Sequence, residues 1–110
     1  MKKEESNDQA TVKQHASKAN LFKFVSNIKI TARQAGILST LATGDEWTMS
    51  MGYLGAEMCV SSPAITAIID KLESKELVER EINEEDKRIT LINLTESGRY
   101  LANLMATRWN

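Results

Sequence analysis

The feature that most constrains the fold of this chain is a pair of short helical segments joined by a three-residue turn. Residues 50–58 predict a brief helix, and residues 59–61 form the turn. Ser61 is a favourable N-cap, and Pro63 is tolerated in a first turn because that amide has no intrahelical partner. Apolar residues then occupy one stripe of the second helix: Ile65, Ile68, Ile69 and Leu72. This second helix, over residues 61–75, is the best-determined element in the sequence.

Two strand-forming runs follow that helix directly, over residues 77–82 and 88–94. The polar residues 83–86 lie between them, so the pair predicts a β-hairpin. In the second run, Thr90, Ile92 and Leu94 face one way while Ile89 and Leu91 face the other. This pattern suits a central strand better than an edge strand.

Helices are predicted on both sides of this unit. Residues 1–10 are polar and are expected to form a flexible tail, and an amphipathic helix is expected from there to about residue 27. Thr31 and Gln34 have the spacing of a capping box, which predicts a helix that ends near Gly44. Residues 46–48 are long enough only for a strand stub, and Thr95 caps a last helix that runs to the end of the chain.

Length and composition limit the alternatives. A chain of 110 residues is one domain, here taken as residues 11–110, and its shares of 42% hydrophobic and 26% charged residues are those of ordinary globular proteins. The single cysteine, Cys59, excludes an intramolecular disulfide and favours a reducing compartment. No apolar run approaches a membrane span, and the start lacks the apolar core of a signal peptide. A soluble, cytoplasmic protein without a membrane partner is expected.

In outline, the helix pair and hairpin form a winged helix-turn-helix, with the helix pair over residues 48–76 and the wing over residues 77–94. With the apolar stripe buried, the outward face of the second helix carries small side chains, including Pro63, Ala67 and Thr66. Such a face allows a helix to lie close to base edges in a major groove about 12 Å wide. The net charge of −1 means that any DNA binding must depend on local placement of charges.

At this point the chain resembles the MarR family of winged helix-turn-helix transcription regulators. The resemblance covers roughly residues 30–100, and five motifs in the family's order carry it: residues 30–34, 60–66 with 70–73, 77–80, 86–88 and 94–99. It implies a mainly α, α+β winged-helix fold whose first and last helices form a homodimer. It also implies a sequence-specific regulator of transcription, a repressor, that binds double-stranded DNA with the second helix in the major groove and the wing in the minor groove.

The resemblance also assigns residues to that site. Ser62, Thr66 and Ala67 become base-side contacts, Ser61 and Lys71 phosphate contacts, and Lys87 and Arg88 wing contacts with DNA. Asp70 and Asp86 are assigned to pairing between wing and helix. In the family the cation beside the helix carboxylate is the wing arginine, so Arg88 is expected beside Asp70.

Four residues depart from the family pattern. Glu76 stands where a glycine is usual, and a non-glycine residue in a left-handed cap costs about 1 kcal/mol. Ala67 stands where an arginine is frequent, and Glu84 with Glu85 lies near the expected phosphate path. These carboxylates favour an alternative function, a winged-helix module that binds a protein partner, such as an antirepressor.

The remaining candidate residues have ordinary structural explanations. His15 has no metal-ligating neighbours and is expected at the surface, and Cys59 is expected to be a small buried hydrophobe. The alternative for Arg88 is a surface ion pair with Asp86. The sequence shows no catalytic motif, so an enzyme, a cofactor and a metal are not expected. Aromatic residues could line a pocket for a small aromatic effector, or serve the core and interface: Phe22, Phe24, Trp47, Tyr100 and Trp109.

Overall fold

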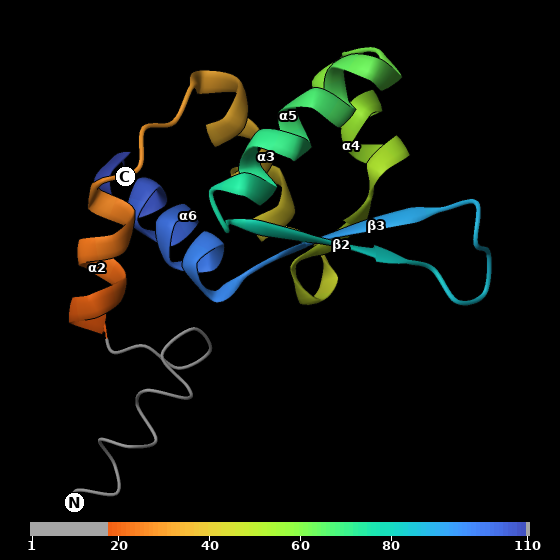
Figure 1. Cartoon of the computed structure of the whole chain (residues 1–110). Helices are drawn as coiled ribbons and strands as arrows, with labels where there is room; N and C mark the ends of the chain where they lie inside the picture. The colour runs from red at the N-terminus through yellow and green to blue at the C-terminus, as the bar shows by residue number, and fades with distance from the viewer. Residues whose placement is uncertain (1–17, 110) are drawn as a thin grey trace, which may run out of the picture.

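The computed structural model describes residues 18–109, which form five α-helices and a small antiparallel sheet (Figure 1). The elements are α2 (Lys18–Ser26), α3 (Ala32–Ala42), the 3-10 turn η1 (Asp45–Trp47), β1 (Thr48–Ser50), α4 (Met51–Met58), α5 (Ser62–Ser74), β2 (Val78–Ile82), β3 (Thr90–Leu94) and α6 (Glu96–Trp109). The mainly helical winged-helix fold predicted from the sequence is confirmed. The expected tail 1–10, the beginning of the first helix and His15 lie outside the described residues.

Helix α3 begins where the capping box predicts. The backbone N–H of Gln34 donates to Thr31 Oγ1, and the backbone N–H of Thr31 donates to Gln34 Oε1, both at 3.1 Å. Both side chains therefore satisfy an amide that the helix itself leaves unpaired. The helix ends at Ala42, close to the Gly44 expected from the sequence.

Helices α4 and α5 form the helix-turn-helix pair and meet at an angle of 109°. Ser50 caps α4 by accepting from the Tyr53 amide, and Ser61 caps α5 by accepting from the Ala64 amide. The apolar stripe of α5 points into the core, where Ile65, Ile69 and Leu72 are buried. Cys59 ends α4 in a left-handed conformation with a φ of 56°.

The expectation that Cys59 is buried is wrong, because its side chain is exposed. Its neighbours in the sequence are apolar, but the left-handed backbone at this cap turns the chain sharply between α4 and α5. Apolar neighbours along the chain therefore do not decide which way a residue at such a turn faces.

The sheet has the strand order β1-β3-β2, so β3 is central as predicted. In the strand register, Ile92 of β3 is paired with Met49 of β1 on one side and with Arg80 of β2 on the other. Ile92 is buried, and it joins the sheet to the helical core. The hairpin formed by β2 and β3 extends away from the helices as the wing (Figure 1).

Backbone contacts at the end of α5 join this helix to both the wing and α6. Glu76 adopts a left-handed conformation with a φ of 61°. This conformation was predicted because a glycine is usual at this position in the family. The Leu77 carbonyl accepts from the Thr95 amide at 3.1 Å. Gly98 lies against this carbonyl so closely that an added Cβ would be 2.1 Å from the oxygen. Only glycine fits at this point of α6.

Helix α2 packs on α6, and the two lie side by side at one end of the molecule (Figure 1). Leu21 and Val25 are buried on α2, and Ala102 is buried on α6. In the described part of the chain no single helix is long and apolar enough to cross a membrane, although α4 and α5 taken together would pass by length and composition.

Candidate nucleic-acid interface

The outward face of α5 has the chemistry expected of a groove-facing helix. Ser62, Thr66, Ala67 and Lys71 are all exposed, on the side opposite the buried stripe. The Ser61 side chain is engaged as the N-cap of α5, so it holds the first turn in place through the Ala64 amide. The first two turns therefore present hydroxyl and methyl groups to the outside.

Helix α4 borders this face with side chains that are equally small. A cleft of about 280 Å³ lies between the two helices and is lined by Gly52 and Ala56 from α4 and by Ser62 and Thr66 from α5, among others. Tyr53 stands exposed beside it, and the carboxylate of Glu57 raises the pKa of its phenol. A phenol is protonated at neutral pH without this shift, and the hydrogen bond to Glu57 takes up its O–H donor.

The cation beside Asp70 is Arg80, and the expected pairing of Asp70 with Arg88 is not present. Arg80 Nη2 forms an ion pair with Asp70 Oδ1, and Arg80 Nε lies 3.4 Å from Glu73 Oε1. The second contact lacks hydrogen-bond geometry, since Nε has no hydrogen-bond partner. Strand β2 packs directly against α5, which brings Arg80 to the helix, whereas Arg88 lies in the wing loop before β3.

Arg88 is instead held within the wing by Asp86. Its Nε and Nη2 donate to the two carboxylate oxygens of Asp86 at 2.9 and 2.8 Å, and its backbone N–H donates to Oδ1 at 3.1 Å. These hydrogen bonds lower the pKa of the Asp86 carboxyl and raise the pKa of Arg88. Partners two residues apart lose little chain entropy on pairing, so the local partner is favoured over Asp70.

The wing tip presents charges of both signs. Lys87, Glu84 and Glu85 are exposed, and the Arg88 side chain remains 88% exposed despite its pairing. Asn83 shapes the loop by accepting from the Glu85 and Asp86 amides at 2.8 and 3.1 Å. The wing thus holds Lys87 and Arg88 at its end on an ordered turn.

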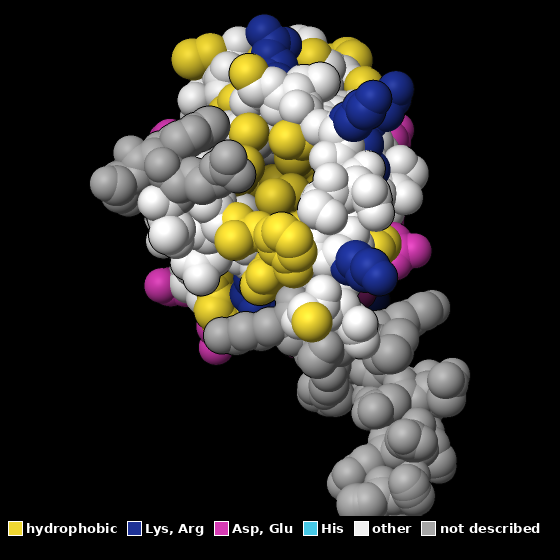
Figure 2. All heavy atoms as spheres, turned by 90° about the vertical axis from the view of Figure 1, so that its left-hand side faces the viewer, with side chains coloured by type: hydrophobic (Ala, Val, Ile, Leu, Met, Phe, Trp, Pro, Cys, Tyr) yellow, Lys and Arg dark blue, Asp and Glu magenta, His cyan; other side chains and the backbone are white. Residues whose placement is uncertain are grey.

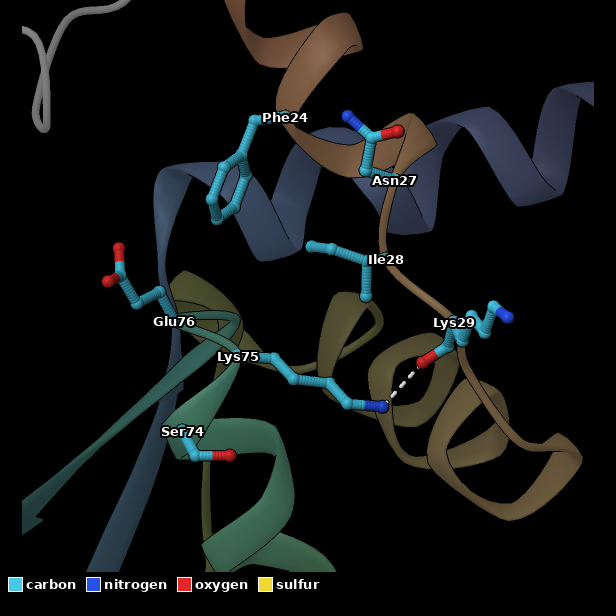
Figure 3. A pocket seen from close by; sticks show the side chains of 7 residues that line it. All are labelled: Phe24, Asn27, Ile28, Lys29, Ser74, Lys75 and Glu76. Carbon is cyan, nitrogen blue, oxygen red and sulfur yellow. Dashed lines mark hydrogen bonds between the residues drawn. The ribbon is translucent and has the colours of Figure 1, made fainter.

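The aromatic residues do not line one shared pocket within the described residues. Phe24 borders a cavity of about 350 Å³ between the end of α2 and the end of α5 (Figure 3). Trp47 lies in a separate cleft beside Arg99, whose guanidinium carbon is 4.5 Å from the ring centroid. Phe22 is 53% exposed and Tyr100 is half-buried, while the side chain of Trp109 lies outside the described residues.

The motifs indicated neither Arg80 nor Lys75 as functional residues. Lys75 Nζ donates to the Lys29 carbonyl and, at 3.1 Å, to Gln34 Oε1. Arg80 belongs to the run 77–80 that carries the resemblance. The carboxylate of Asp70 on the preceding helix has the opposite charge, and this was the one signal in the sequence that could have indicated the pair. For Lys75 the sequence holds no such signal, because its acceptors are 46 and 41 positions away.

The end of the molecule that carries α2 has an apolar surface. Figure 2 shows hydrophobic side chains gathered across the middle of this face. Phe22 and Phe24 of α2 are exposed, and Leu101 and Met105 of α6 are only partly buried. Val25 of α2, by contrast, is buried within the chain. Across residues 18–109, no group of three potential metal ligands lies together.

Comparisons with known proteins agree with this geometry. The family model described as MarR family matches residues 30–90. The HTH-type transcriptional regulator YdgJ of Bacillus subtilis is 36% identical over 77 residues, which is 70% of this chain and 46% of that protein. The chain therefore spans about half the length of this relative.

Two solved structures illustrate the shared fold. AbsC, a MarR family transcriptional regulator from Streptomyces coelicolor, is 27% identical with a TM-score of 0.71, covering 82% of this chain and 61% of that chain. A mutant of MarR from E. coli complexed with operator DNA is 31% identical with a TM-score of 0.65, covering 76% of this chain and 59% of that chain.

Proposed function

Because the chain belongs to the MarR family, we propose that it is a transcription regulator that binds double-stranded DNA in a sequence-specific manner. The observation that carries this proposal is the outward face of α5, where Ser62, Thr66 and Ala67 are exposed and small. The E. coli relative complexed with operator DNA supports the same use of the fold. In this proposal α5 enters the major groove and the wing reaches the adjacent minor groove.

Each proposed contact follows from side-chain chemistry. Ser and Thr hydroxyls can bond either base edge, and the methyl groups of Thr66 and Ala67 suit the thymine methyl. Lys71, on the flank of the same helix, is placed to contact a phosphate, as are Lys87 and Arg88 at the wing tip. The Ser61 hydroxyl and the first amides of α5 lie at a helix N-terminus, which favours a phosphate as well.

We further infer a homodimer formed through α2 and α6. The apolar face in Figure 2 supports this assembly, because exposed aromatic side chains on a helix are better accommodated in an interface than in water. Phe22→Asp should leave a monomer in light scattering. Ile82→Asp is a matched control, because Ile82 is also 53% exposed but lies on the wing. A dimer that survives Phe22→Asp would contradict this interface.

The test of DNA binding is a salt series on double-stranded sites selected from a random library. Three cations per subunit, Lys71, Lys87 and Arg88, predict a slope of log affinity against log salt of about −5 for a dimer. Lys71→Ala should reduce this slope by about two, one for each subunit. Lys23→Ala, on α2, should leave the slope unchanged. Affinity that does not depend on salt would favour the protein-interaction module or antirepressor instead.

Repression is the proposed direction of regulation, because a protein bound across its operator excludes polymerase from an overlapping promoter. Transcription in vitro from a template with the selected site should fall when the protein is added. A rise in transcript would show an activator.

A small aromatic effector is proposed for the cavity beside Phe24. The ring of Phe24 and the side chain of Ile28 give it apolar walls, and Ser74 and Lys75 give it polar groups (Figure 3). Benzoate and phenol, followed by NMR, should shift the signals of Phe24 and Ile28. Shifts confined to Trp47 would place the ligand in the other cleft.

A further inference from the structure

Lys75 lies between the C-terminal end of α5 and the end of α2. Its backbone N–H caps α5 by donating to the Lys71 and Leu72 carbonyls at 3.1 and 3.2 Å. Its side chain extends away from the end of α5 and crosses the cavity to the Lys29 carbonyl (Figure 3). The same ammonium donates to Gln34 Oε1 at 3.1 Å. One residue thus joins α5, the segment between α2 and α3, and the start of α3.

The Gln34 acceptor of this ammonium is held in place by a second hydrogen bond. Gln34 is 7% exposed, and it is the one buried polar side chain among the described residues. Its Oε1 also accepts from the Thr31 amide, so the capping box fixes its position. The Lys29 carbonyl belongs to the short connection that leaves α2.

Apolar packing does not fill this junction. A cavity of about 350 Å³ separates Phe24 and Ile28 from Ser74 and Glu76. The buried stripe of α5 runs to Leu72, and the residues that follow it, Ser74 and Lys75, line this cavity. The ammonium bridges this gap by its hydrogen bond to the Lys29 carbonyl, in the connection that follows α2.

We propose that Lys75 is a positioning residue that sets the direction of α5 relative to α2 through its hydrogen bonds to Lys29 and Gln34. This inference rests on the proposed function, since α2 forms the dimer and α5 enters the groove. Helix α5 has 13 residues and is about 20 Å long. A rotation of about 10° about its Lys75 end would move the Ser62 end by about 3.4 Å, which is one base-pair step. Lys75 thereby selects the spacing between half-sites without touching DNA.

The experiment compares wild type, Lys75→Met, Lys75→Arg and Lys71→Met on a set of DNA palindromes. The set places one selected half-site at centre-to-centre spacings from two base pairs shorter to two base pairs longer than the preferred one. Wild type should lose about tenfold in affinity per base pair of altered spacing, the scale of one mismatched pair. Lys75→Met should reduce this loss to about threefold or less, while Lys75→Arg keeps it. Lys71→Met should weaken binding equally at every spacing, because it removes a phosphate contact.

A second measurement is independent of DNA. Residual dipolar couplings of the α2 and α5 amides in the free, full-length protein report the angle between the helices. These couplings should change in Lys75→Met and stay as in wild type in Lys75→Arg, and well-dispersed amide spectra establish that each variant is folded.

The two measurements distinguish a failure of the positioning role of Lys75 from a failure of the proposed DNA-binding function. Unchanged couplings in Lys75→Met, or an unchanged spacing preference, would overturn the positioning role. If wild type binds no DNA while the couplings of Lys75→Met still change, the proposed function fails and the positioning of α5 by Lys75 stands.

Discussion

Removing the guanidinium of Arg80 should weaken DNA binding, although Arg80 is not one of the proposed contacts. In the structure Arg80 neutralises Asp70 on the outward face of α5 and also approaches Glu73. Arg80→Met keeps the length of the side chain and removes its charge. Asp70 then presents an uncompensated carboxylate to the DNA backbone.

The magnitude follows from the charges involved. A carboxylate about 8 Å from a phosphate repels it by about 0.5 kcal/mol in water. Two phosphates near each subunit of a dimer bring the unscreened total to about 2 kcal/mol. Screening over one Debye length of about 8 Å at physiological salt reduces this to about 0.7 kcal/mol, or about threefold in affinity. The stability of the fold should also change little, by about 1 kcal/mol or below, because the side chains of Arg80 and Asp70 are 30% and 59% exposed.

The assay is fluorescence anisotropy on a selected operator at two salt concentrations, with wild type, Arg80→Met, Asp70→Asn and the double variant. Asp70→Asn should restore most of the affinity that Arg80→Met loses, and this sign defines the coupling. A parallel cycle with Arg88→Met serves as the matched control, because Arg88 pairs with Asp86. Rescue of Arg88→Met by Asp70→Asn, without rescue of Arg80→Met, would refute the pairing described here.

Three further predictions concern the free protein. Glu76→Gly should raise the free energy of unfolding by about 0.5–1 kcal/mol, because Glu76 has a positive φ; an unchanged or lower urea midpoint would contradict this strain. Gly98→Ala should lower the free energy of unfolding by about 2 kcal/mol, because its Cβ would meet the Leu77 carbonyl. Gly52→Ala, with open space around its Cβ, should raise the free energy of unfolding by about 0.5–1 kcal/mol. Equal effects of Gly98→Ala and Gly52→Ala would count against the close contact between Gly98 and the Leu77 carbonyl. The pKa of Asp86, followed by carboxyl NMR, should lie below the usual value and rise part of the way towards it in Arg88→Met, where the backbone N–H of residue 88 still donates, but not in Lys87→Met; a wild-type value in Arg88→Met would mean that the Arg88 guanidinium is not a cause.

Local patterns predicted most of the fold because the interactions behind them are local. The capping box of Thr31 and Gln34 and the N-cap Ser61 each join residues three positions apart. The stripe of α5 and the alternation in β3 repeat within single elements, so both could be assigned before any tertiary contact was known. Glu76 was also predicted, since a family glycine marks a left-handed position and the backbone there has a positive φ.

Cys59 and Lys75 show where such patterns stop. Whether Cys59 is buried or exposed depends on the direction in which its turn faces. The residues around it show no helical or strand periodicity from which this direction could be predicted. The acceptors of Lys75 lie on segments that meet only after α2, α3 and α5 have packed. Gln34 was identified as a cap, but its second role needs the fold, because one carbonyl oxygen accepts two donors from different elements.

The exchange of partners between Arg80 and Arg88 has the same origin and bears directly on function. Both arginines lie near Asp70 in the sequence, and only the packing of β2 on α5 decides that Arg80 reaches it. Arg80 is then used inside the subunit, so Arg88 does not have to neutralise the helix. Arg88 must still release the Asp86 carboxylate before it can enter a groove, which subtracts hydrogen bonds from whatever it gains there. Because the wing contact is discounted in this way, Lys71 and the small face of α5 should carry more of the binding free energy than the family motif alone would suggest.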